Sequence, residues 1–207
     1  MYEPMGLKKE KADIDRMTAV ERALKRVGDV AGAIVLLIVL SPVLIYICVR
    51  QKMNASGPIF YRQERIGKGG KPFYIYKFRT MVVDAEKDGV PQLEQADDPR
   101  LTSFGRSLRK HHLDELPQIW NVLKGDMSFV GYRPERKYFI DQIMQQNADY
   151  ALLYRTCPGV TSLATIENGY TDTMEKMLRR LDMDLYYLRH RSLWLDIKIL
   201  TKTLFNI

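Results

Sequence analysis

The sequence predicts an α+β fold: a predominantly helical cytoplasmic domain with a short β-hairpin, attached to a membrane by a re-entrant helix and amphipathic interfacial helices. Three observations predict it. Residues 31–49 are an apolar run without charged residues, two short β-prone runs flank a glycine-rich connection, and helical periodicity returns in several separate stretches. We divide the chain into a membrane-associated part, residues 1–52, and one cytoplasmic domain, residues 53–207, which is long enough to have its own core.

The lead-in to the apolar run, residues 10–26, has helical periodicity. Charged residues occupy most of the predicted helix, and its apolar residues share one stripe: Ile14, Met17, Val20, Ala23 and Leu24. This pattern predicts an amphipathic helix that lies at the bilayer surface.

The apolar run itself is of membrane-span length, but Ser41 and Pro42 interrupt its middle. Pro42 lacks the N–H group that would bond the carbonyl of Ile38, and the Ser41 hydroxyl can satisfy that carbonyl instead. We therefore expect a bend at Ser41 and Pro42.

Charges on both sides of the apolar run decide between two topologies. Basic residues lie close to each end: Arg16, Arg22, Lys25 and Arg26 before it, and Arg50, Lys52 and Arg62 after it. Since Lys/Arg asymmetry orients a spanning helix and there is almost none here, a re-entrant hairpin with both flanks in the cytoplasm is favoured. A proline-kinked spanning anchor is the alternative.

The remaining elements follow in order. Residues 59–63 and 73–78, joined by GKGGKP, predict a β-hairpin, and the polar stretch 84–100 predicts an exposed loop. Helical periodicity covers 113–123, 135–146 and 174–188. Residues 193–205 form a last helix, which either lies at the membrane interface or packs on the domain core.

Composition narrows the class of partner. The net charge of +7 suits anionic lipid head groups and phosphorylated substrates. Nucleic acid is the competing partner, but the chain has no helix-turn-helix, RNP or zinc-finger pattern, so we expect none. Cys48 and Cys157 stand apart without a CxxC pair, which fits a reducing cytosol.

The densest chemical signal lies in residues 98–135. Adjacent carboxylates, Asp114 and Glu115, follow a basic stretch, and Pro117 favours the first turn of a helix. Leu116, before that proline, is biased away from helical angles, so we expect the two carboxylates at the N-terminal edge of the helix. There they can bind a divalent cation that bridges a diphosphate. Ordinary helix capping beside a solvated basic face is the alternative, and zinc at His111 and Glu115 would lack two ligands.

These motifs together resemble the monotopic phosphoglycosyl transferases, the bacterial sugar transferases that start lipid-linked glycan assembly. The resemblance covers about residues 25–204 and rests on ordered segments: LKRVGDVAGA, Ser41-Pro42, SGPIFYRQERIGKGGKPFYIYKFRTM, DPRLTSFGRSLRKHHLDELPQIWNVLKGDMSFVG and DLYYLRHRSLWLDIKIL. The family's membrane element is a re-entrant helix bent at Ser-Pro, in agreement with the flanking charges.

The resemblance implies transfer of a sugar 1-phosphate from a UDP-sugar to a polyprenyl (undecaprenyl) phosphate, with release of UMP. Asp114 matches the nucleophile, which forms a covalent aspartyl-phosphosugar, and Glu115 matches its partner in metal and proton handling, with Mg²⁺ as cofactor. The other matches are phosphate-binding Arg109, further substrate contacts Arg133, Lys77 and Arg79, and a supporting Asp184. The implied location is the bacterial inner membrane, monotopic, with the catalytic domain on the cytoplasmic face; a homodimer is left open.

The role of Arg109 carries a structural expectation. A continuous helix through 106–123 would place Lys110 on the side of the two carboxylates and turn Arg109 away from them. We therefore expect a break near His111 and His112.

Two departures from the family pattern qualify the match. The family's Pro-Arg-Pro is Tyr132-Arg133-Pro134 here, which removes the backbone restraint of the first proline. Residues 157–169 read CPGVTSLATIENG where many members carry Gly-Trp-Ala-Gln, so the donor sugar is left unassigned. The rival functional interpretation is a membrane-tethered basic binding or scaffold module without catalysis, which explains the charge but not the paired carboxylates.

Overall fold

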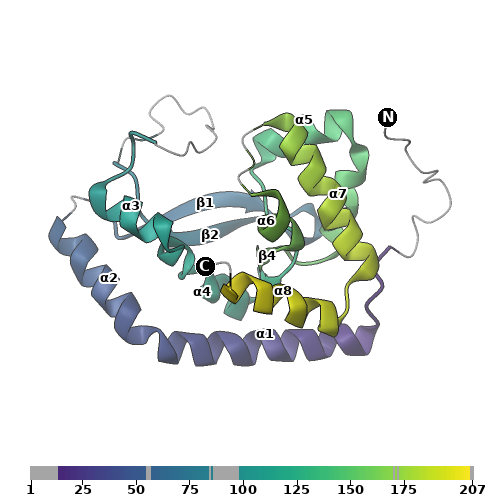
Figure 1. Cartoon of the computed structure of the whole chain (residues 1–207), viewed down its shortest axis with the longest axis horizontal. Helices are drawn as coiled ribbons and strands as arrows, with labels where there is room; N and C mark the ends of the chain where they lie inside the picture. Colours follow the sequence, from purple (N-terminus) through teal and green to yellow (C-terminus); the bar gives the residue numbers. More distant parts are fainter. Residues whose placement is uncertain are drawn as a thin grey trace.

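The structure, a computed structural model, describes residues 14–54, 57–83, 85, 98–169, 171 and 173–205. Most of these residues are helical, and the described strands form two small sheets, an antiparallel pair and a parallel pair. The predicted α+β class is confirmed at this level (Figure 1). The predicted loop at 84–100 lies largely outside the described residues.

The elements follow one another in this order: α1 (Ala19–Val39), α2 (Ser41–Asn54), β1 (Phe60–Ile66), η1 (Lys68–Gly70), β2 (Pro72–Phe78), α3 (Ser103–Lys110), η2 (Leu113–Glu115), α4 (Gln118–Lys124), β3 (Ser128–Val130), α5 (Lys137–Gln146), η3 (Ala148–Arg155), β4 (Gly159–Thr161), α6 (Leu163–Asn168), α7 (Met174–His190) and α8 (Leu193–Phe205).

Helix α1 begins later than predicted. The Thr18 hydroxyl accepts the Glu21 N–H at 3.2 Å, while the Glu21 carboxylate accepts the Thr18 N–H at 2.9 Å. This capping box starts the helix at Ala19, so residues 14–18 are not helical, and 10–13 lie outside the described residues. Ile14 and Met17 are therefore buried in the protein rather than placed on a bilayer-facing stripe.

The predicted bend at Ser41 and Pro42 is confirmed. Helices α1 and α2 meet there at 60°, and the Ser41 hydroxyl donates to the Ile38 carbonyl at 2.7 Å, replacing the bond that Pro42 cannot make. Among the described residues no single helix has the length and apolar character for a membrane crossing. The bent pair has them when its two arms are taken together.

The bent pair has an inner face that packs on the protein and an outer face that does not. Ala33 of α1 belongs to an apolar cluster with α4, and Ile47 of α2 belongs to another with Phe78 and Leu108. The outer face is a strip of exposed apolar side chains: Ile34, Val35, Ile38, Val39, Val43, Ile45, Tyr46 and Val49. Such a strip is far larger than the isolated apolar residues that soluble surfaces carry.

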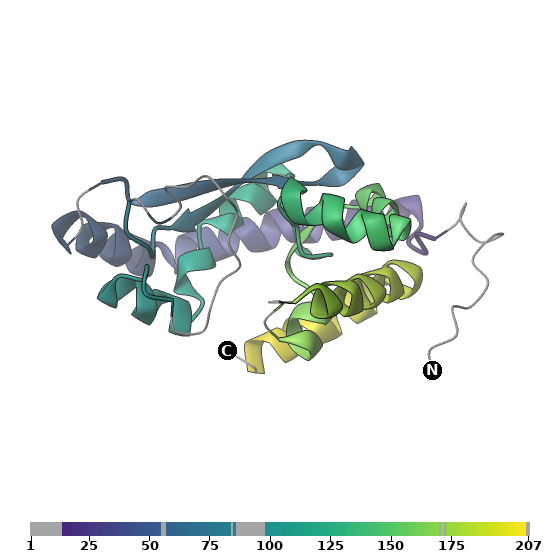
Figure 2. The same ribbon diagram turned by 90° about the horizontal axis from the view of Figure 1, so that it is seen from above.

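The predicted hairpin is confirmed, with a longer first strand than expected. Strands β1 and β2 pair antiparallel from Phe60 opposite Phe78 to Ile66 opposite Pro72. Figure 2 shows the hairpin (blue) along one side of the structure and α7 and α8 (olive and yellow) along the opposite side. The remaining edge of β2 is closed by Asn121 of α4, whose amide bonds the Tyr76 N–H at 3.1 Å and the Tyr74 carbonyl at 2.7 Å.

The C-terminal part packs around α5, η3 and α7, and the short parallel pair β3–β4 connects it to α4. The predicted helices at 135–146, 174–188 and 193–205 correspond to α5, α7 and α8. Helix α8 packs on the domain core through Ile199, which contacts Val130 and Tyr187, while Trp194, Ile197 and Leu204 are exposed.

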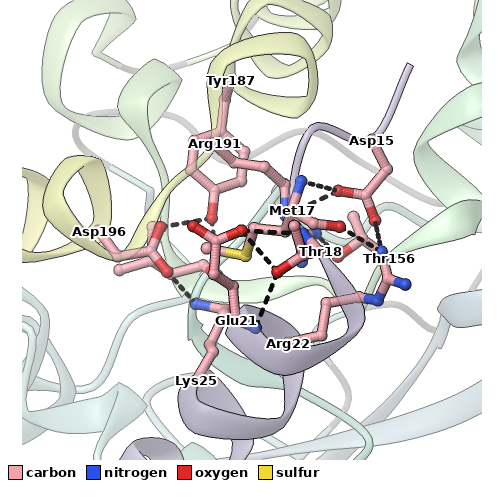
Figure 3. A network of polar contacts seen from close by, with 11 residues as sticks. Asp15, Met17, Thr18, Glu21, Arg22, Lys25, Thr156, Tyr187, Arg191 and Asp196 are labelled. Atoms are coloured by element: carbon pink, nitrogen blue, oxygen red, sulfur yellow. Dashed lines mark hydrogen bonds and ion pairs between the residues drawn. The ribbon is translucent and has the colours of Figure 1, made fainter. Parts of the chain in front are cut away.

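A polar network joins the beginning of the described chain to its end (Figure 3). The Lys25 ammonium of α1 lies 2.5 Å from the Asp196 carboxylate of α8, and Tyr187 donates to the same carboxylate at 2.6 Å. Asp15 pairs with Arg191, between α7 and α8, at 3.2 Å. Buried ion pairs contribute little net stability, but each has one low-energy geometry, so this network fixes the orientation of α1 on the C-terminal helices.

Candidate active site

The segment that carries Asp114 and Glu115 is a short 3-10 turn between two helices. Helix α3 ends at Lys110, His112 adopts a left-handed conformation with φ 52°, and α4 begins only at Gln118. The predicted break near His111 and His112 is confirmed. The expectation for Leu116 was wrong: its angles, φ −52° and ψ −36°, are helical, because the 3-10 turn continues directly into α4.

The turn is seated on the second arm of the bent helix pair. Leu113 and Leu116, on either side of the two carboxylates, pack against the cluster formed by Ile47, Phe78 and Leu108. Asp114 between them is only 6% exposed. The apolar packing therefore couples the position of the carboxylates to helix α2.

Glu115 is held in an ionised state by two cations. The Lys77 ammonium of β2 lies 2.6 Å from its Oε1, and the Arg133 guanidinium lies 3.7 Å from the same oxygen. Burial by itself would raise the pKa of Glu115, but Lys77 and Arg133 outweigh burial and hold that pKa at about 2. A carboxylate with so low a pKa is a poor proton carrier at neutral pH, and its chemistry here is ion pairing or metal binding.

These charged groups line a small pocket that is open to solvent. Its walls come from the hairpin, the 3-10 turn, the start of α4 and two loops: Arg65, Ile75, Lys77, Glu115, Gln118, Arg133, Pro134 and Gly159. Three of the eight are cationic and one is anionic, so the pocket favours anionic ligands. Gly159 alone represents the divergent stretch 157–169 in this lining.

Arg133 sits on a loop that is anchored on both sides. The preceding residue, Tyr132, is buried, forms a β-bridge with Pro158 and accepts the Gly159 N–H at 2.8 Å. The β-bridge thus supplies the backbone restraint that a proline would give at this position. On the other side, Arg65 donates to the Pro134 carbonyl at 3.1 Å.

Buried charges lie directly behind this loop. Glu135 pairs with Arg65 at 3.0 Å and with Arg180 at 2.9 Å. Asp184 is buried and bonds the Arg133 backbone; burial raises its pKa to about 7, against the lowering effect of Arg180 and that backbone bond. Asp184 thus contacts the loop that positions Arg133 and does not line the pocket.

Neither Arg109 nor Arg79 lines the pocket. Both are close to Thr80, since Arg79 precedes it in sequence and Arg109 bonds its side chain. The Arg109 guanidinium donates to the Thr80 hydroxyl at 2.9 Å. Gly105 makes this close approach of α3 feasible, because a Cβ there would meet the Thr80 carbonyl oxygen at 2.0 Å. Arg79 is buried, and its guanidinium lies beside Gly57. The structure thus unites Lys77, Glu115 and Arg133, keeps Asp114 adjacent, and sets Arg109 and Arg79 at the end of β2.

The carboxylates fit one kind of metal. In the part of the chain that the structure describes, no three His, Cys, Asp or Glu side chains converge on a metal position. Mg²⁺ requires fewer protein ligands than such a cluster supplies. It is commonly held by one or two carboxylates, and waters and substrate phosphates complete its coordination shell. Asp114 and Glu115 carry carboxylate oxygens of that type, and of the two only Glu115 lines the pocket.

Sequence reasoning missed Arg65, Glu135 and Gln118. The partners of Arg65 and Glu135 are far apart in the chain, so spacing gives no signal for their contact. Gln118 was accessible to sequence reasoning, since it is a polar residue that follows the two carboxylates directly after Pro117.

The sequence matches a known protein family over most of its length. The model of the family described as bacterial sugar transferase matches residues 20–207. The chain is 44% identical over 192 residues to the UDP-glucose:undecaprenyl-phosphate glucose-1-phosphate transferase of Escherichia coli K12, covering 92% of this chain and 41% of that protein.

Two further relatives differ in the sugar for which they are named and in the share of their length that this chain covers. A UDP-N-acetylgalactosamine-undecaprenyl-phosphate N-acetylgalactosaminephosphotransferase of Aeromonas hydrophila is 38% identical, over 89% of this chain and 43% of that protein. A UDP-glucose:undecaprenyl-phosphate glucose-1-phosphate transferase of Caulobacter vibrioides is 41% identical, over 86% of this chain and 67% of that protein. The chain thus spans less than half the length of the first two relatives.

Proposed function

Because the chain belongs to the bacterial sugar transferase family, we propose that it transfers a sugar 1-phosphate from a UDP-sugar to undecaprenyl phosphate and releases UMP. The relatives are named for glucose and for N-acetylgalactosamine, so the proposal leaves the sugar open. The product, a lipid-linked sugar diphosphate, would start the assembly of a bacterial glycoconjugate.

The observation that carries the proposal is the turn with two adjacent carboxylates beside a pocket lined by cationic side chains. Two anionic substrates must approach an anionic nucleophile, so neutralisation of charge is the main catalytic task. Lys77 and Arg133 supply positive charge at the pocket, and their ion pairs with Glu115 keep them in place before substrate binds.

The proposed chemistry has two displacements. A carboxylate oxygen of Asp114 forms a bond to the β-phosphorus of the UDP-sugar, and the bond from that phosphorus to the bridging oxygen breaks, so UMP leaves with the electron pair. A phosphate oxygen of the lipid then attacks the same phosphorus and releases the Asp114 carboxylate. Neither displacement requires a proton transfer, which agrees with a Glu115 that stays ionised.

Mg²⁺ is the proposed cofactor, held by Asp114 and Glu115. When bound, it would neutralise charge on the diphosphate. Glu115 would contribute as a ligand and a charge anchor for Lys77, rather than as an acid or base.

The bent helix pair supports a membrane location. Its exposed apolar face and the exposed apolar residues of α8 favour contact with lipid on one face of the bilayer, with both basic flanks in the cytoplasm. We propose a monotopic attachment to the inner membrane, in which the turn packed on α2 meets the phosphate of the lipid at the interface.

Mass spectrometry of the intact protein tests the covalent step. The wild type is mixed with Mg²⁺ and, in turn, UDP-glucose or UDP-N-acetylgalactosamine, without lipid acceptor. We expect UMP release and a protein heavier by one sugar phosphate, and this adduct should disappear on addition of undecaprenyl phosphate.

Asp114→Asn is the decisive variant, because it keeps the size of the side chain and removes the anionic nucleophile. Adduct and turnover should both vanish, whereas Glu115→Gln should slow turnover and leave the adduct on Asp114. Turnover by Asp114→Asn, after deamidation has been excluded, would refute the mechanism. UMP release only in the presence of acceptor would indicate direct attack by the lipid phosphate.

A further inference from the structure

Gln118 is a largely buried polar side chain whose amide has no hydrogen-bond partner among the described residues. It is the first residue of α4, it is 4% exposed, and it lines the pocket beside Lys77 and Glu115. Among the residues that the structure describes, none hydrogen-bonds its side chain. Asn121, one turn further along α4, shows the usual situation, since both groups of its amide bond the edge of β2.

Most buried polar groups in proteins are hydrogen-bonded. The amide atoms of Gln118 are not among the fully enclosed side-chain atoms without a partner in the described residues, so they keep access to solvent. The Gln118 amide is not sealed inside the protein, because its side chain forms part of the wall of the open pocket. Its hydrogen-bonding capacity is therefore directed to whatever enters the pocket.

The chemistry of the lining indicates which part of a ligand this amide meets. Arg65 and Lys77 are cations that already have carboxylate partners, and with Arg133 they suit the diphosphate. Gln118 is the neutral polar side chain of the set, and it presents both donors and an acceptor. A sugar hydroxyl, which donates and accepts, is the matching group.

The position along the chain agrees with this match. In the proposed reaction the sugar is joined through one oxygen to the phosphorus that Asp114 attacks. Gln118 follows Asp114 by four residues, and its side chain lines the same pocket as that of Glu115, so a sugar on that phosphorus would lie close to its amide. The uridine is on the far side of the diphosphate.

We propose that the Gln118 amide binds a ring hydroxyl of the donor sugar and contributes to the recognition of the sugar. This assignment rests on the proposed function, since it takes a UDP-sugar as the ligand of the pocket. A site that pairs a substrate hydroxyl discriminates strongly against a ligand without it, because its own polar groups are then left unpaired.

Binding measurements compare Gln118→Met with its parent, both carrying Asp114→Asn so that no turnover occurs. Met keeps the length of the side chain and removes the amide. The ligands are UDP and whichever of UDP-glucose and UDP-N-acetylgalactosamine gives more UMP with the wild type. We expect Gln118→Met to raise the Kd of the UDP-sugar on the order of tenfold, a change of about 1.4 kcal/mol, and to change the Kd of UDP less than twofold. Gln145→Met, at an exposed site of α5, is the matched control.

Two outcomes would overturn the assignment. Equal weakening for UDP and for the UDP-sugar would place the amide on the nucleotide or the diphosphate, and unchanged affinity for both would mean that no contact exists. If Gln118→Met does not fold, Gln118→Asn replaces it, because it withdraws the amide by one methylene and should give the same selective loss. UMP release by the wild type is recorded separately, so failure of the proposed function, with no UMP from any donor, is distinct from failure of this contact.

Discussion

Asn121 links the strand that carries Lys77 to the helix that follows Glu115, and Asn121→Leu should loosen both the fold and the site. Its side chain is fully buried, accepts the Tyr76 N–H at 3.1 Å and donates to the Tyr74 carbonyl at 2.7 Å. Leu branches at Cγ as Asn does but is bulkier, so it leaves both backbone groups without a partner and also crowds the buried site.

The magnitude follows from those two groups. Each backbone group left unpaired on partial burial costs about 1–3 kcal/mol, and we take the lower half of that range because both groups lie at a strand edge. The sum is about 2–4 kcal/mol of unfolding free energy. For a chain of this size each kcal/mol shifts the unfolding midpoint by about 2–4 °C, so we expect a fall of roughly 4–16 °C.

Thermal unfolding of the detergent-solubilised protein measures this shift, with Gln145→Leu on the exposed side of α5 as the control. The same variant should form the sugar-phosphate adduct more slowly at temperatures well below its midpoint, because the register of Lys77 against Glu115 depends on this contact. A midpoint within 1 °C of the wild type would refute the reasoning, and a lowered midpoint with unchanged adduct formation would confine Asn121 to stability.

Three further predictions concern single contacts. Arg109→Ala should lose far more turnover than Lys110→Ala, because Arg109 bonds Thr80 at the end of β2 while Lys110 is exposed; equal losses would remove Arg109 from the phosphate-binding set. The pKa of Asp184 is about 7 in the folded state, above its unfolded value near 3.8. Between these values the folded state binds a proton that the unfolded state has lost, so wild-type stability should fall as pH rises from about 4 to 7. Asp184→Asn, neutral throughout and still an acceptor, should lack this decline in urea titrations at pH 5 and pH 8; an identical decline would assign it to other groups. Pro42→Ala restores the missing N–H and should straighten the bend of 60°, seen as a longer distance between spin labels on α1 and α2; an unchanged distance would mean that packing alone maintains the bend.

Local chemistry was sufficient for the sequence to determine several features of this protein. The bend at Ser41 and Pro42 and the hairpin around GKGGKP arise from backbone preferences of residues next to one another. The break near His111 and His112 was instead expected from the role that the family resemblance gives Arg109. The paired carboxylates and the excess of basic residues likewise indicated a site for phosphorylated ligands before any contact was known. The start of α1 was misjudged because the apolar periodicity extends N-terminally beyond Thr18, whereas the capping box at Thr18 makes Ala19 the first residue of the helix.

The tertiary structure decided which side chains share the site. Lys77 and Glu115 are 38 positions apart and meet because α4 docks on β2, and Arg133 joins them because buried partners hold its loop. The same docking leaves Arg79 beside Gly57 and turns Gln118 into the pocket, although all of these residues lie in motifs visible in the sequence. Periodicity and spacing specify the face on which a residue lies within its own element, whereas the packing of one element on another determines what that face contacts.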